Sequence, residues 1–365
     1  MSIWRWADYF CRIPSQHHVT LGEGNTPLVR SRRIGPMAGL DNLYFKVECA
    51  NPTGSYKDRF AAAAISDMLA HDQSRSIGAS SGNTGSAVAA YCAAAGITCE
   101  LAIVANAPHD KLKQMMAYGA NVYKVKGLGV SPEVSQQSMQ YLAQKASQPD
   151  AQLQISAYVL SPAGMAGVQT ISYELAEQAG KLGAAGLSID HVFVQAGGGG
   201  LTLAVALGFA GLVQRGELEK SPAVHCVQPE GNNTIAGPLR DGAEKAHAVA
   251  ECTSKVSGLQ VPRVMDGNEV ISACRACGGT GYLVTDEDTW QLQSRLAREE
   301  GIFTEPAGAV ALAGALQRYQ QGQINGDDVV VCLVTGFGFK DNASVDRMIA
   351  DADCPAIDVE QIPEQ

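Results

Sequence analysis

Short apolar runs alternate along most of the chain with longer segments in which apolar residues recur at helical spacing. Short apolar runs indicate buried strands, and a period of three to four residues indicates helices. The predicted strands are 99–104, 122–125, 192–195, 224–227 and 329–334, and the predicted helices are one from about 60, 86–95, 111–118, 131–146, 166–182, one from about 201 and 285–301. This order predicts an α/β fold with parallel-rich sheets flanked by helices.

Two of these helices carry clear start signals. Ser131 stands before Pro132, which is the preferred order of an N-cap residue and the first helical residue. Thr285 opens a capping-box pattern with acidic residues, and Gly301 is the expected C-terminal stop of the same helix.

The chain has 365 residues, which is more than one hydrophobic core usually serves, so two lobes are expected, each with a twisted sheet. Hydrophobic residues make up 46% and charged residues 18%, the profile of a compact enzyme. The formal charge of −10, without a basic run, argues against nucleic acid as a partner.

Localisation signals point to the cytoplasm. No segment approaches the run of about 18 apolar residues that spans a membrane, and the N-terminus lacks the apolar core of a signal peptide. The ten cysteines show no paired spacing, which is typical of reduced thiols in a cytoplasmic protein. Cys274 and Cys277 form a lone CxxC without a second ligand pair, so no metal site is expected.

Residues 51–59, Asn-Pro-Thr-Gly-Ser-Tyr-Lys-Asp-Arg, form the first segment that carries chemistry. The Asn-Pro-Thr-Gly turn places Lys57 near the start of an alanine-rich helix. The partial positive charge of a helix N-terminus disfavours a cation, so the pKa of Lys57 is expected to be lowered, which favours Schiff-base chemistry. The alternative interpretation is a solvated surface lysine.

Residues 79–85, Ala-Ser-Ser-Gly-Asn-Thr-Gly, form the second segment and lead into the helix predicted from Ser86. Small hydroxyl residues, an amide and glycines at a helix start form an anion-binding nest that fits a substrate carboxylate. The candidate residues are Ser80, Ser81, Asn83 and Thr84. The alternative is an ordinary helix cap with turn glycines.

Residues 195–201, Gln-Ala-Gly-Gly-Gly-Gly-Leu, form the third segment, with a strand before it and a helix after it. The backbone of Gly197, Gly198, Gly199, Gly200 and Leu201 can wrap a phosphate with its N–H groups. The run lacks the Gly-Lys-Ser/Thr of a P-loop and the third glycine of a dinucleotide fingerprint. Four consecutive glycines cost backbone entropy, so a merely structural turn is a poor explanation.

Two further segments complete the candidate site. Thr335 directly follows the buried strand 329–334, and residues at the carboxyl ends of parallel strands face the ligand crevice. Its neutral hydroxyl can hydrogen-bond a ring nitrogen, or it can simply cap a turn. Glu305, in Glu-Pro-Ala-Gly-Ala, can support a cofactor ring or begin a helix.

Together and in this order, the segments resemble fold-type II enzymes that use pyridoxal 5'-phosphate (PLP), specifically the threonine synthase and threonine dehydratase family. Residues 21–28, 51–59 and 335–341 are similar to threonine synthases, whereas 197–201 and 305–309 look more like dehydratases. The resemblance implies an architecture like that of the tryptophan synthase β chain. It implies a large PLP-phosphate-binding domain of residues 1–45 and 161–365, a smaller substrate-carboxylate-binding domain of residues 46–160, and a homodimer.

The same resemblance implies a role for each candidate residue. Lys57 would attach PLP as a Schiff base, and its released amine would remove the substrate's α-proton. Asn83 would bond the 3'-oxygen of the cofactor, Gly197 to Leu201 would hold its phosphate, and Thr335 would contact the pyridine nitrogen. Ser80, Ser81, Asn83 and Thr84 would surround the substrate carboxylate, with Glu305 in a supporting position.

The implied activity is that of a PLP-dependent lyase which eliminates or replaces a β- or γ-group of an L-amino acid, as in the conversion of O-phosphohomoserine to threonine. The arginine of the usual phosphate-binding segment falls near Gly164 and is missing, and Phe337 stands where a histidine is expected. The missing arginine points away from a phosphorylated substrate, and Phe337 points to altered chemistry or a more apolar substrate side. The alternatives are a threonine or serine dehydratase that yields a 2-oxo acid and ammonia, and a non-catalytic PLP-binding or amino-acid-binding protein.

The stretch 230–267 has many polar residues and few apolar runs. It is predicted to be either a mobile flap or an excursion that contacts a partner.

Overall fold

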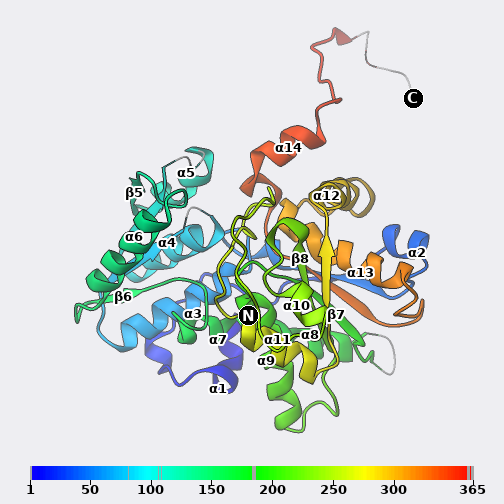
Figure 1. Ribbon diagram of the computed structural model, residues 1–365, viewed down its shortest axis with the longest axis horizontal. Coiled ribbons are helices and arrows are strands. Elements are labelled where there is room, and N and C mark those ends of the chain that lie inside the picture. Colours follow the sequence, from blue (N-terminus) through cyan, green and yellow to red (C-terminus); the bar gives the residue numbers. More distant parts are fainter. Residues whose placement is uncertain are drawn as a thin grey trace.

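The computed structural model describes residues 2–80, 82–105, 107, 109–182, 186–359 and 362, and it contains two sheets (Figure 1). The larger sheet has the order β1-β2-β10-β7-β8-β9, and only the β1–β2 pair is antiparallel. Its strands are β1 Leu28–Arg30, β2 Leu43–Val47, β7 His191–Gln195, β8 Ala223–Pro229, β9 Gly281–Val284 and β10 Val330–Val334. The central strand β10 is buried along its whole length, as its continuous apolar sequence predicts.

The smaller sheet is entirely parallel, with the order β5-β4-β3-β6. Its strands are β3 Arg75–Ala79, β4 Thr98–Val104, β5 Asn121–Val125 and β6 Ala151–Leu153. All four lie within the predicted smaller domain of residues 46–160, whereas β2 of the larger sheet crosses the predicted boundary after residue 45. The division into two domains therefore stays a prediction.

Helices flank both sheets, and in Figure 1 α4, α5 and α6 accompany the smaller sheet on the left while α12 and α13 lie beside the larger one. The α-helices are α1 Ala7–Phe10, α2 Ile34–Ala38, α3 Lys57–Ala70, α4 Asn83–Ala95, α5 His109–Ala117, α6 Pro132–Ala146, α7 Pro162–Val168, α8 Thr170–Gly180, α9 Gly200–Gln214, α10 Ala236–Arg240, α11 Gly267–Ala276, α12 Asp286–Glu300, α13 Val310–Gln320 and α14 Asn342–Met348. The 3-10 helices are η1 Ile3–Trp6, η2 Ser15–His17, η3 Glu48–Ala50, η4 Glu230–Asn232, η5 Pro306–Ala309 and η6 Gly338–Lys340. The predicted α/β class with parallel-rich sheets is confirmed.

The predicted helix starts are confirmed in atomic detail. The hydroxyl of Ser131 accepts the N–H of Val134 at 3.2 Å, and the hydroxyl of Thr285 accepts the N–H of Asp288 at 3.0 Å. Gly301 ends α12 with a φ of +70°, a left-handed conformation that favours glycine.

The predicted single helix 166–182 is wrong, because the chain forms α7 and α8 with Gln169 between them. The hydroxyl of Thr170 donates to the carbonyl of Gly167 at 2.6 Å, a side-chain bond that competes with regular helical bonding. Close packing sets the position of α7 against α3. A Cβ on Gly167 would lie 2.5 Å from the carbonyl oxygen of Arg59, so only glycine allows this approach.

The irregular stretch 230–267 folds over the rest of the larger lobe, with Ile235, Val256 and Leu259 buried. Backbone and side-chain atoms of residues 258–266 lie directly against the glycine run that precedes α9. All ten cysteines are free, and Cys354 is exposed. In the described part of the chain no helix is long and apolar enough to cross a membrane, and no three His, Cys, Asp or Glu side chains gather as metal ligands.

Candidate active site

The turn before α3 joins two of the segments that the sequence singled out. The N–H of Gly54 donates to the carbonyl of Asn51 at 2.8 Å, and the φ of +88° at Gly54 is a conformation that favours glycine. Two residues further on, the N–H of Tyr56 donates to the carbonyl of Thr335 at 3.1 Å. Lys57 is the first residue of α3, which begins three residues before the predicted start at about 60, and it lies beside the carboxyl end of β10.

The amine of Lys57 lies inside the site. It donates to the hydroxyl of Ser156 at 2.6 Å and sits 4.4 Å from the ring centre of Tyr56. Burial lowers the pKa of Lys57 to about 7, and the carboxylates of Glu305 and Asp266 oppose this shift only in part. The sequence predicted the direction of the shift from the helix N-terminus, but burial is the leading cause.

The start of α4 brings a second hydroxyl next to Ser156, the partner of this amine. Thr84 lies in the first turn of α4, and its hydroxyl is 3.1 Å from that of Ser156. The hydroxyl of Ser80 accepts two backbone N–H groups of the same loop at 3.2 and 3.3 Å. Ser81, the remaining predicted hydroxyl, lies outside the described residues.

Asn83 is held by an acidic residue that the sequence placed only in a supporting position. The amide nitrogen of Asn83 donates to a carboxylate oxygen of Glu305 at 2.7 Å. The N–H of Glu305 donates to the carbonyl of Gly336 at 3.0 Å, and a Cβ on Gly336 would lie 2.0 Å from the same carboxylate. Glu305 thus orients Asn83 and packs against the Thr335–Gly336 segment, and one N–H of the Asn83 amide is left for another acceptor.

Thr335 carries a hydroxyl whose own proton is available. Its oxygen accepts the side-chain N–H of Gln195 at 2.8 Å, and Gln195 also donates to the carbonyl of Ala307 at 2.8 Å. Thr335 is buried, with an exposed fraction of 3%. Because the oxygen already accepts, the hydroxyl can donate to a neutral acceptor such as a ring nitrogen.

The glycine run ends in the N-terminus of α9. Gly199 takes the N-cap position with a φ of +99°, and no side chain caps the helix, so the first N–H groups remain for an anion. A Cβ on Gly199 would lie 2.8 Å from Val270, and one on Gly200 would lie 2.9 Å from Met165. Gly199 therefore has the strictest need for glycine, because its positive φ and its contact with Val270 both disfavour a side chain.

Asp266 and Ser156 were missed from the sequence. The carboxylate of Asp266 accepts the backbone N–H groups of Tyr158 and Val159 at 2.9 and 3.1 Å, and it lies 3.2 Å from where a Cβ on Gly200 would be. Asp266 therefore ties the loop that carries Ser156 to the glycine run. Its position directly before α11 was the only sequence signal, and Ser156 could have been found from its place after β6, at the carboxyl end of a parallel sheet.

Gly164, where the family's phosphate-binding arginine was expected, is tightly packed. A Cβ at this position would lie 2.6 Å from the ring of Phe60 and 2.9 Å from Ala64. An arginine cannot be accommodated here without moving α7 away from α3.

The described residues fit PLP. An amine with a lowered pKa can form a Schiff base, an uncapped glycine-rich helix N-terminus can hold a phosphate, and the hydroxyl of Thr335 can meet the pyridine nitrogen. The fold and the site together define a PLP-dependent enzyme.

The chain belongs to the family of pyridoxal-phosphate dependent enzymes, whose family model matches residues 19–336. It is 29% identical to the threonine synthase of Methanocaldococcus jannaschii over 353 residues, which cover 93% of this chain and 81% of that protein. It is 30% identical to the threonine synthase of Methanosarcina acetivorans over 371 residues, with 98% and 85% covered.

Solved structures agree on the fold. The processed form of threonine deaminase isoform 2 from Solanum lycopersicum has a TM-score of 0.75 at 20% identity, covering 96% of this chain and 88% of that one. Maize serine racemase has a TM-score of 0.73 at 24% identity, covering 90% and 92%. The chain is thus a threonine synthase-like lyase with PLP as its cofactor, and the predicted family, fold and cofactor are confirmed.

The lowered pKa of Lys57 has a testable consequence for cofactor capture. Only the neutral amine is nucleophilic, so the rate at which the cofactor-free enzyme captures PLP should rise with pH through a midpoint near 7 and level off about one pH unit above it. The measurement is the rate at which the visible absorbance band appears between about pH 5.5 and 9.5, with Nα-acetyl-lysine as the reference, whose free side-chain amine has an ordinary pKa of about 10.4. An enzyme profile that follows the reference amine would contradict the assignment.

Proposed function

We propose that this enzyme acts on an L-amino acid with a leaving group on its β- or γ-carbon, and that it eliminates or replaces this group as threonine synthases do. The observation that carries the proposal is the amine of Lys57, which lies 2.6 Å from Ser156 between the α4 loop and the carboxyl end of β10. An amine in this place can hold the cofactor and then work on the substrate beside it.

The site residues divide the work by their chemistry. In this proposal Gly197, Gly198, Gly199, Gly200 and Leu201 hold the cofactor phosphate through their backbone N–H groups. Asn83 bonds the 3'-oxygen, with Glu305 fixing the orientation of its amide. Ser80, Ser81 and Thr84, together with Asn83, receive the substrate carboxylate at the start of α4.

When bound, PLP supplies an electron sink for the charge that develops at the α-carbon. Lys57 is the base that takes the α-proton and later returns a proton to the product, which a pKa of about 7 allows near neutral pH. Ser156 accepts a hydrogen bond from the Lys57 amine and keeps it directed into the site. Thr335 offers a neutral hydroxyl, which leaves the pyridine nitrogen unprotonated and favours elimination or replacement at the side chain.

A second reaction is favoured by specific observations, namely dehydration of threonine, serine or another β-hydroxy amino acid. The packing around Gly164 excludes the arginine that would bind a substrate phosphate, and two backbone N–H groups beside Ser156 are already taken by Asp266. A dianionic substrate group would meet a carboxylate here instead of a guanidinium.

Product analysis separates the two reactions. The purified enzyme is offered O-phospho-L-homoserine, L-threonine and L-serine, and both phosphate and 2-oxo acid are measured, with Lys57→Ala as the blank. Phosphate release with formation of threonine supports the synthase reaction, whereas 2-oxo acid and ammonia support the dehydratase. A kcat of about 1 s⁻¹ or more marks a physiological substrate. Cofactor binding without any turnover of these and related amino acids would contradict both reactions in favour of a binding protein.

We also propose a cytoplasmic homodimer and a smaller substrate-binding domain of residues 46–160. The free cysteines support the compartment, since ten unpaired thiols suit a reducing environment. The four strands of the smaller sheet, which all lie between residues 75 and 153, support the smaller domain.

A further inference from the structure

The smaller sheet has an open edge at β5. In the described part of the chain β5 pairs only with β4, so its outer side presents unpaired backbone groups. Tyr123 of β5 has an exposed fraction of 56%, and Lys124 beside it is exposed as well. An edge strand of this kind is a template for a further strand.

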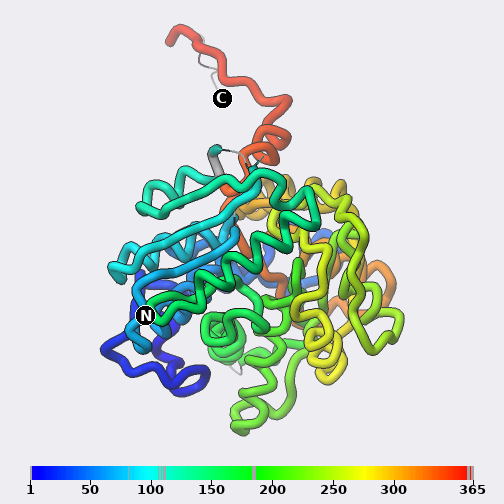
Figure 2. The backbone as a smooth tube through the Cα atoms, turned by 60° about the vertical axis from the view of Figure 1, so that its left-hand side comes forward, coloured from blue at the N-terminus to red at the C-terminus, as the bar shows by residue number. Residues whose placement is uncertain are grey.

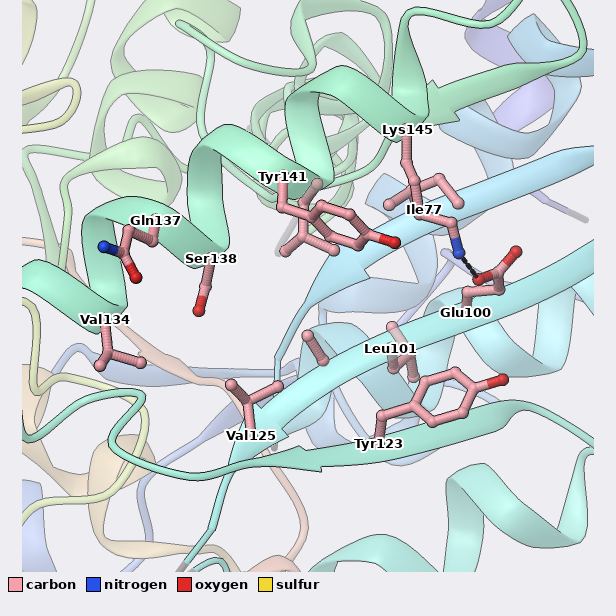
Figure 3. Close-up of a pocket in the computed structure, with 12 residues that line it drawn as sticks. Ile77, Glu100, Leu101, Tyr123, Val125, Val134, Gln137, Ser138, Tyr141 and Lys145 are labelled. Atoms are coloured by element: carbon pink, nitrogen blue, oxygen red, sulfur yellow. Dashed lines mark hydrogen bonds and ion pairs between the residues drawn. The ribbon is translucent and has the colours of Figure 1, made fainter.

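A groove of about 500 Å³ opens beside this edge, between the strands and α6 (Figure 3). Tyr123 and Val125 line it from β5, and Val134 and Tyr141 line it from α6, which crosses above the strands in Figure 3. The lining is mostly apolar, and an ion pair between Lys145 and Glu100 closes one end. Tyr141 has an exposed fraction of 61%, so the apolar surface is not covered.

The C-terminal segment complements this uncovered groove, because it carries apolar residues that are exposed to solvent. Beyond α14 the chain leaves the body of the molecule in both views (Figures 1 and 2). Ile357 and Val359 have exposed fractions of 48% and 78%, and Asp358 stands between them. This alternation of apolar and acidic residues is typical of a half-buried strand.

We propose that residues 355–359 of one copy of this chain add as a strand to the outer side of β5 in a second copy. In both segments two apolar side chains flank a single charged one, so the apolar faces of the two strands can lie on the same side. Tyr123 and Val125 face the groove, so Ile357 and Val359 would continue the apolar surface under α6. Lys124 points to the opposite face, and there Asp358 would lie opposite it.

Charge makes this pairing selective. An exposed lysine on an edge strand discourages pairing with neutral or basic strands, but it favours an acidic one. The side chain of Lys124 donates to the carbonyl of Ala107 at 3.2 Å, which keeps its charge at the edge of the sheet on the α5 side. The C-terminal segment 351–358 contributes Asp351, Asp353 and Asp358 and no basic residue.

The second copy, and not the chain's own body, is the expected acceptor. The root of the C-terminal segment is tied to the neighbouring α5, because the side chain of Lys340 donates to that of Gln114. Further along the segment, Ile357 and Val359 are exposed. From this root the segment runs outward and away from β5 (Figure 1). A projecting arm with its own strand pattern, next to an open edge on the same molecule, is the arrangement from which reciprocal strand exchange arises.

Cross-linking tests the proposal, because Cys354 is an exposed thiol three residues before Ile357. Two versions of the full chain are coexpressed and purified with PLP bound. One version retains Cys354 and carries Lys124→Arg and Lys126→Arg, and the other retains both lysines and carries Cys354→Ser. A thiol-to-amine cross-linker can then join Cys354 to Lys124 or Lys126 only between copies, and mass spectrometry identifies the joined peptides.

The expected result is a cross-link between the two versions, which is lost when Ile357→Asp and Val359→Asp are added to the copy that retains Cys354. Met37→Asp is the matched control, since Met37 is an exposed apolar residue (71%) on the distant helix α2 and its replacement should leave the cross-link unchanged. A cross-link in the wild-type chain that is absent from the coexpressed pair would show docking on the chain's own β5 and overturn the proposal. Absence of any link between Cys354 and β5 would overturn it as well. Retention of the PLP absorbance band in each variant shows that the site is still formed.

Discussion

Replacing Lys57 with alanine is expected to lower kcat by more than about 10²- to 10⁴-fold, the range that a positioned general base alone contributes. The loss should exceed that range because the same amine also holds the cofactor, and both functions end together. Two measurements check this result, namely the steady-state kcat with the best substrate and the visible absorbance of the purified protein. The absorbance band should be absent from Lys57→Ala when the protein is isolated without added PLP.

Lys220→Ala is the matched control, because Lys220 is an exposed lysine between α9 and β8 and belongs to none of the site segments. It should keep both the band and the activity. Circular dichroism distinguishes loss of chemistry from loss of fold, since Lys57→Ala removes a side chain from the first turn of α3 without touching its core face. A Lys57→Ala protein with a normal band and normal turnover would refute the assignment of this amine.

The parts of the site that could be predicted from the sequence are those in which a short segment carries its own chemistry. Four consecutive glycines between a strand and a helix have few uses besides close backbone contact with a ligand, and the structure shows that a Cβ on Gly199 would collide with Val270. The turn at 51–54 likewise fixes Lys57 at a helix start regardless of its surroundings. Local rules of turns and caps apply to such segments before any tertiary packing is known.

Ser156 and Asp266 could not be predicted in this way, because each acquires its meaning only from distant partners. Ser156 meets the amine of Lys57 from 99 positions away, and Asp266 meets Tyr158 from 108 positions away. The cause of the Lys57 pKa shift was misjudged for the same reason. Burial depends on how three segments pack around the amine, whereas the helix N-terminus is visible in the sequence.

Packing also decided where the long helix 166–182 breaks. Its apolar spacing continues through Gln169, so the sequence pattern favoured one helix. The break arises from the contact of Gly167 with the backbone of Arg59 and from the bond of Thr170 back to Gly167. Neither contact has a signature in the local order of residues.

A buried cluster of four charges beneath α3 illustrates how far tertiary contacts override residue type. Arg59 and Lys46 face Glu48 and Glu174, and all four side chains have exposed fractions of 0%. Arg59 bonds to both carboxylates at 2.8 Å and also donates to the hydroxyl of Thr170 at 2.9 Å. Burial alone would raise the pKa of Glu174, but Arg59 and Lys46 hold it well below its ordinary value. The cluster ties α3, and therefore Lys57, to β2 and α8.

Arg59→Met is therefore expected to destabilise the protein by about 3–5 kcal/mol, because it leaves two buried carboxylates with a single cation between them. The comparison is urea unfolding followed by circular dichroism at pH 7, with PLP present at the same concentration for every variant. Arg295→Met is the matched control, since Arg295 pairs with Glu299 one turn away on the outer face of α12 and such a pair contributes at most about 0.5 kcal/mol.

Arg59→Met should also weaken retention of PLP, because the first turn of α3 loses its anchor two residues after Lys57, whereas Arg295→Met should not. Equal unfolding midpoints for the two variants would mean that the cluster does not hold α3 in place, and the link from this buried charge network to the position of the Lys57 amine would be wrong.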